Sequence, residues 1–130
     1  MALTRVINSG IGVAASIAGE GTATTSLQQG LAKVWIAFDG TGPSIDDSFN
    51  VTSLSDSGTG ATTITIANDM ASANYSVAGT SVGSGGYFNG WLQGGGTDKA
   101  SGSVLVTTRH ESSGNVDLDE VSTSIHGDLA

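Results

Sequence analysis

The run from Val34 to Phe38 constrains the fold of this chain more than any other feature, because all five of its residues are apolar. Val34, Ile36 and Phe38 alternate with Trp35 and Ala37, and this period of two is that of a β-strand. A strand that is apolar on both faces must be covered on both faces. In a two-layer fold of about 100 residues only one face meets the core. The face of Trp35 and Ala37 therefore requires a partner, and we expect it to form a subunit interface.

Short alternating runs continue after this strand, separated by turn residues. Phe49 and Val51 are expected on one face of the next strand, and the segment 55–60 (SDSGTG) has the composition of a turn. Further strands are expected at 62–66, 75–77, 87–93, 103–108 and 116–127. About seven or eight strands without a convincing helix predict an all-β fold, an antiparallel β-sandwich or small barrel, and we expect a jelly-roll-like sandwich.

Composition limits the classes of function. The chain has 130 residues with 20 glycines, one proline and no cysteine, so neither disulfides nor thiolate metal sites can stabilise it. Oligomerisation is the simplest remaining way to stabilise so small a domain. The net charge of −8 disfavours binding to nucleic acid or to an anionic membrane. No stretch approaches the roughly 18 consecutive apolar residues of a membrane span.

The first thirty residues differ from the rest, since they are rich in Gly, Ala, Ser and Thr. A single helical turn is expected around Leu27 and Leu31. The segment is too poor in large apolar residues to fold by itself, so we expect an N-terminal docking arm (1–30) before a β-sandwich domain (31–130). The arm would become ordered along the strand edge of a partner. Its docking residues are expected to be Leu3, Val6, Ile7, Ile11 and Val13.

Catalytic motifs are missing from the sequence. There is no G-x-S-x-G elbow, no G-x-x-x-x-G-K-[ST] loop and no H-E-x-x-H helix. His110 beside Glu111 is the one His–acid neighbour pair, and His126 lies near Asp128. Two histidines without cysteine do not make a typical zinc site. We therefore expect no enzymatic activity and no cofactor, with both histidines at strand ends facing solvent.

Calcium is the one ion that the sequence leaves open. Two acidic segments could supply oxygen ligands, although neither has the spacing of an EF-hand. The alternative is a solvated acidic strand edge, with Asp117 and Asp119 on one face, that deters stray pairing. The candidate ligands are Asp39, Asp46 and Asp47 in the first segment and Asn115, Asp117, Asp119 and Glu120 in the second.

The segment 83–96 holds three aromatic residues between glycine clusters: Tyr87, Phe88 and Trp91. Exposed aromatic rings could stack on a sugar ring, whereas buried ones would fill the core. We expect Phe88 to be buried. Tyr87 and Trp91 remain candidates for a receptor loop.

The segment 30–79 resembles one that is common in tailed-phage virion proteins. GLAKVWIAF followed by GTG matches the family pattern G-L-A-K-x-W-x-x-F-x-G-T-G, and SFNVTSLSDSGTG matches S-F-N-V-x-S with the turn that follows it. Met70 and ANYSV match a third element, and the closing VDLDEVSTSIHGD resembles the family's ending. Ala37, Thr62 and Ile64 depart from the pattern but keep its polar and apolar roles.

The resemblance implies a structural role in the virion, often as a homotrimer, and no catalytic residues. We expect a virion surface protein made in the host cytoplasm that docks on the major capsid protein or another virion protein. With only thirty residues before the sandwich, a capsid decoration or cement subunit fits better than a fibre tip. The alternative is a tail-fibre or appendage tip that binds a host glycan through Tyr87 and Trp91.

Overall fold

The computed structural model describes residues 16–18, 24–26, 30–83, 98–110 and 114–130. Backbone contacts divide the chain into two compact units, Met1–Leu31 and Ala32–Ala130. In the first unit the described residues form an antiparallel hairpin of β1 (Ser16–Ala18) and β2 (Thr24–Ser26). Most of the expected helical turn near Leu31 lies outside the described residues. So do the five expected docking residues Leu3, Val6, Ile7, Ile11 and Val13.

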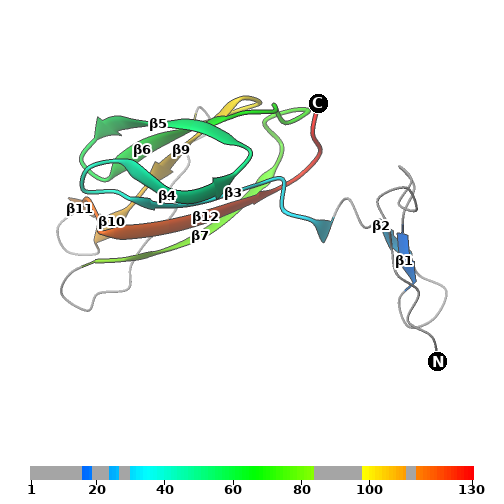
Figure 1. Ribbon diagram of the computed structural model, residues 1–130, viewed down its shortest axis with the longest axis horizontal. Helices are drawn as coiled ribbons and strands as arrows, with labels where there is room; N and C mark the ends of the chain where they lie inside the picture. Colours follow the sequence, from blue (N-terminus) through cyan, green and yellow to red (C-terminus); the bar gives the residue numbers. More distant parts are fainter. Residues whose placement is uncertain (1–15, 19–23, 27–29, 84–97, 111–113) are drawn as a thin grey trace. The chain divides into compact units, whose positions relative to one another are not determined.

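The second unit is an antiparallel β-sandwich, which confirms the predicted fold class. Figure 1 shows its two layers, one sheet in the order β4-β3-β12-β7 and the other in the order β5-β6-β9-β8. β10 and β11 form a separate hairpin. The strands are β3 (Val34–Asp39), β4 (Ser44–Phe49), β5 (Val51–Gly58), β6 (Ala61–Ile66), β7 (Ser76–Val82), β8 (Lys99–Ala100), β9 (Ser103–Thr107), β10 (Arg109–His110), β11 (Gly114–Asn115) and β12 (Glu120–His126).

The core lies between the two sheets and follows from the alternation in the sequence. Each central strand points every second residue inward, where apolar side chains of the two sheets meet. The alternation expected for β3 is confirmed, since Val34, Ile36 and Phe38 are buried, and threonines share the inward faces of β6 and β12. The buried apolar residues are Val34, Ile36, Phe38, Ile64, Ile66, Met70, Tyr75, Val104, Val106, Val121 and Ile125.

The expectation that Phe49 and Val51 share one face of a single strand is wrong. The chain passes from the first sheet to the second at Asn50, which has a positive φ of 59°. Asparagine adopts this backbone more readily than most residues. Its side-chain amide donates to the carbonyl oxygens of Lys33 and Asn68, both at 3.1 Å. Phe49 is consequently left exposed, whereas Val51 packs against the core.

The turn expected at 55–60 is shorter than its composition suggests. β5 continues through Gly58, with irregular pairing at two places, and the chain reverses only at Thr59 and Gly60. A side chain at Gly60 would collide with the carbonyl oxygen of Thr108 and the backbone nitrogen of Val116, and φ is 64°. Glycine is therefore required at this position.

Asp117 has a local role that the sequence did not suggest. It precedes β12, so Asp117 and Asp119 do not share a strand face as expected. The Asp117 Oδ1 atom accepts a hydrogen bond of 2.5 Å from the Gly60 backbone nitrogen. This carboxylate thus fixes the β5–β6 turn against the segment that leads into β12.

Tyr75 joins the two sheets at one side of the sandwich. Its hydroxyl lies 3.0 and 2.9 Å from the carbonyl oxygens of Ala100 and Ser103, at the turn between β8 and β9. The Lys99 Nζ atom donates to the Tyr75 carbonyl oxygen at 3.0 Å and lies 5.2 Å from the ring centroid. Burial raises the pKa of Tyr75, because the charged phenolate would lose solvation.

Candidate interaction surface

Exposed apolar side chains gather on one of the two sheets. Within the described part of the sandwich unit, the exposed large apolar residues are Leu129 near the C-terminus and four residues of β3, β4 and β7. Those four, Trp35, Ile45, Phe49 and Val82, are between 38 and 54% exposed. All four belong to the β4-β3-β12-β7 sheet.

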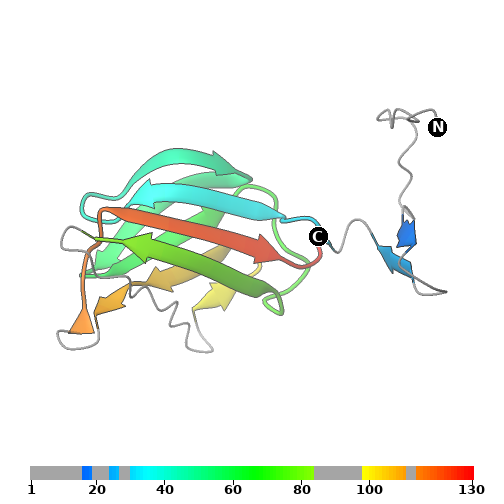
Figure 2. The same ribbon diagram turned by 90° about the horizontal axis from the view of Figure 1, so that it is seen from below.

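The strand register explains how this surface is built. Phe49, Trp35, Ser124 and Ala78 lie opposite one another across the four strands in one row. The parallel row consists of Asp47, Ala37, Ser122 and Thr80. All of these residues point away from the core, because the alternate residues of β3 and β12 are the buried ones. We call this outer side of the sheet the Trp35 face, and Figure 2 looks onto it with β12 between β3 and β7.

A shallow groove of about 470 Å³ runs beside the Trp35 side chain. Its floor is low because the neighbouring strands present only small residues there. Ala37 of β3, Ser122 and Ser124 of β12, and Ala78 and Thr80 of β7 line it. The groove therefore combines an aromatic wall with a smooth floor of methyl, methylene and hydroxyl groups.

Ionisable side chains lie at the borders of the Trp35 face. Asp47 is on the edge strand β4, and Glu120 and His126 are at the two ends of β12. The described residues that line the groove carry no ionisable side chain. A partner of either charge would thus meet an uncharged centre, which suits burial because no ion has to be desolvated.

The described residues show no arrangement that supports catalysis. His110 lies in β10 and His126 at the end of β12, in separate parts of the topology. A hollow of about 320 Å³ near Tyr75 is lined by Ser76, Lys99 and apolar residues of β7 and β9. The described residues of this lining include no histidine and no acid.

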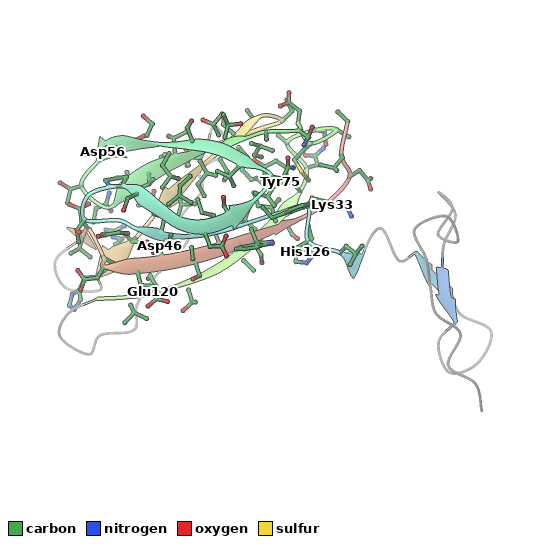
Figure 3. All side chains as sticks on the ribbon, in the orientation of Figure 1. Lys33, Asp46, Asp56, Tyr75, Glu120 and His126 are labelled. Atoms are coloured by element: carbon green, nitrogen blue, oxygen red, sulfur yellow. The ribbon has the colours of Figure 1, made fainter. Side chains whose placement is uncertain are left out.

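The candidate calcium ligands are not brought together. Among the described residues, no three His, Cys, Asp or Glu side chains converge as a metal site. Asp39 accepts hydrogen bonds from the Thr41 hydroxyl at 2.6 Å and the Thr41 backbone nitrogen at 2.7 Å. The Thr41 hydroxyl, and then its backbone N–H, lower the pKa of Asp39. Asp46 and Asp47 are exposed residues of β4, and Figure 3 labels Asp46 there.

Sequence reasoning found part of this surface. It placed Trp35 and Ala37 together on an outward face, and the structure shows both on the Trp35 face. It missed Phe49 and Val82, because Phe49 was assigned to the wrong strand and the sequence pattern did not pair β7 with β12. Tyr87, Phe88 and Trp91 all lie outside the described residues.

The described residues contain no helix that is long and apolar enough to cross a membrane. In comparisons with known proteins, no family model, curated sequence or solved structure matches the chain.

Proposed function

We propose that this chain is a non-enzymatic structural protein on the surface of a tailed-phage virion, where it decorates and cements the capsid. The proposal combines the virion-protein resemblance of residues 30–79 with the geometry of the Trp35 face. In this role the sandwich contacts neighbouring subunits, and the resemblance implies three copies. The N-terminal arm attaches the protein to the major capsid protein or another virion protein.

The main support for the proposal is that the outer faces of the two sheets differ in their exposed large apolar residues. Trp35, Phe49 and Val82 are exposed on one outer face, and in the described part the other sheet exposes no large apolar residue. Trp35 and Phe49 are cross-strand neighbours, and exposed apolar side chains that lie together are typical of a contact surface. The floor of the groove beside Trp35 is made of residues from paired strands, which suits a structural contact.

The direct test is to locate the protein on purified particles of the phage that encodes it. A density map of the particle should show the sandwich on the capsid, and antibodies against the purified chain should label the capsid in electron micrographs. Labelling confined to the tail would contradict capsid decoration and favour the fibre-tip alternative. Particles that lack the chain altogether would overturn the proposal.

A residue-level test compares Trp35→Ala with Thr65→Ala. Trp35 is on the Trp35 face, whereas Thr65 faces outward on the opposite sheet. If Trp35 anchors a contact, its truncation should weaken binding by about 2 kcal/mol or more. Occupancy on particles should fall for Trp35→Ala and remain unchanged for Thr65→Ala. Equal occupancy of both variants would show that the Trp35 face does not form the proposed contact.

The absence of enzymatic activity is tested separately with the double variant His110→Gln, His126→Gln. Particles carrying it should assemble and infect as the unmodified ones do. A loss of hydrolytic activity on host envelope material in this variant would contradict the structural role.

A further inference from the structure

Three of the four edge strands in the sandwich have features that oppose pairing with another chain. β4 exposes Asp46 and Asp47, and its register against β3 is interrupted. β5 exposes Asp56, as Figure 3 shows, and its register against β6 shifts twice. β8 has only two residues. Charge, irregular pairing and short length are the usual protections of an edge strand.

The fourth edge, β7, has none of these protections. Its sequence SVAGTSV contains neither charge nor proline. All seven of its residues pair with β12 without a shift in register, so the strand is long and regular. Figure 2 shows β7 at the border of its sheet, and no described strand pairs with its other side. Alternate residues of such a strand direct their N–H and C=O groups outward, ready to pair.

We propose that β7 is the docking edge for a second copy of this chain, and that two β7 strands pair antiparallel about a two-fold axis. This inference deepens the proposed function and rests on it for its biological setting. It names the partner and the backbone contact by which neighbouring sandwiches associate.

The negative charge of the chain favours β7 as the edge at which a second copy pairs. Each chain has a net charge of −8, so two copies repel one another wherever their carboxylates meet. Paired strands lie about 4.8 Å apart, a distance at which opposed carboxylates are destabilising. β4 and β5 would oppose acidic residues in a symmetric pair, whereas β7 would not. β7 is therefore the long edge at which two acidic copies can approach.

The side chains of β7 also fit a symmetric partner. In a register centred on Gly79, Ala78 of each copy lies opposite Thr80 of the other, and these small side chains leave room for close approach. Ala78 and Thr80 line the groove beside Trp35. Pairing would join two four-stranded sheets into one of eight strands and make the two Trp35 faces continuous.

The test is Thr80→Lys with Thr52→Lys as its matched control. Both threonines are exposed and lie on edge strands, Thr80 on β7 and Thr52 on β5. An edge lysine opposes strand pairing, and two-fold symmetry would bring two of them into one interface. Light scattering of the protein as it elutes from a size-exclusion column should give about half as many copies per assembly for Thr80→Lys as for the wild type. Thr52→Lys should match the wild type.

Halving is expected because the two-fold β7 contact would join two like units, either two single chains or two of the three-copy units that the resemblance implies. A monomeric wild type at micromolar concentration would overturn the inference. An unchanged copy number in a folded Thr80→Lys variant would also overturn it. Either result leaves the virion location untouched, because particle labelling tests that independently.

Amide hydrogen exchange gives a second readout that needs no substitution. Amides of β7 should exchange more slowly as the wild-type concentration rises, while those of β5 should not respond. In Thr80→Lys, exchange from β7 should be independent of concentration. If wild-type β7 amides are protected equally at every concentration, a segment of the same chain covers the edge and the inference is wrong.

Discussion

The two sheets of the sandwich have similar inner faces and different outer faces. Inward, both present alternating apolar residues, such as Phe38 of β3 and Ile64 of β6. Outward, the β5-β6-β9-β8 sheet presents mainly Ser and Thr, whereas the other sheet exposes Trp35 and Phe49. Folding requires only the inner faces to match, so an apolar outer face indicates a requirement outside the isolated chain.

The largest expected effect on stability is a difference between variants on the two faces of β3. Phe38→Ala should lower the free energy of unfolding by about 3–5 kcal/mol, because it opens a cavity between the sheets. Trp35→Ala, three residues earlier in β3, should cost the isolated chain about 1 kcal/mol or less. Urea denaturation of both variants gives the comparison. Equal losses would mean that Trp35 is part of the folding core and not of a contact surface.

A second variant tests the point where the chain changes sheet. Asn50→Ala should cost about 1–3 kcal/mol, since it removes the amide's hydrogen bonds to Lys33 and Asn68 and leaves a left-handed residue without them. Asn74→Ala, at an exposed asparagine outside this group of bonds, is the matched control and should be nearly neutral. Thermal unfolding of both proteins measures the difference. Equal melting temperatures would show that the crossover does not depend on Asn50.

A smaller effect on stability is expected when the Tyr75 hydroxyl, which links the two sheets, is removed. Tyr75→Phe should cost about 1 kcal/mol at neutral pH, because the hydrogen bonds to Ala100 and Ser103 are lost. Burial raises the pKa of Tyr75 above its ordinary value of 10.0. The folded protein then binds more protons than the unfolded chain above pH 10.0, so stability falls as the pH rises through this range.

Denaturation at pH 8 and pH 11 tests this linkage. The wild type should lose more stability between the two pH values than Tyr75→Phe does. If both lose the same amount, groups other than Tyr75 cause the alkaline decline.

The smallest effect is expected on the outer face of the second sheet. Thr65→Ala should change stability by no more than about 0.5 kcal/mol, because Thr65 lies outside the core. It should also leave the copy number unchanged. A fall in copy number would place a subunit contact on the sheet that exposes no large apolar side chain in its described part, and the contrast between the two outer faces would lose its meaning.

Local patterns were sufficient for most of the strands and failed where the backbone turned. The alternation in β3 predicted which of its side chains share the buried face, because a period of two fixes the face of each residue. Continuing the alternation across Asn50 failed, because one left-handed residue redirects the chain from one sheet to the other. The same kind of error extended the turn at 55–60 into residues that belong to β5.

The sequence by itself determined the all-β class, the inward residues of the central strands and the outward position of Trp35, since these depend on neighbours along the chain. The tertiary structure alone decided which strands became edges and which residues surround Trp35. Those properties depend on pairings between distant segments, such as β12 with β3 and β7. The sequence of β7 gives no sign of lying at a border, and the sheet order places it there with neither charge nor bulge. The groove beside Trp35 likewise exists because small residues from three strands, far apart in the chain, meet in register.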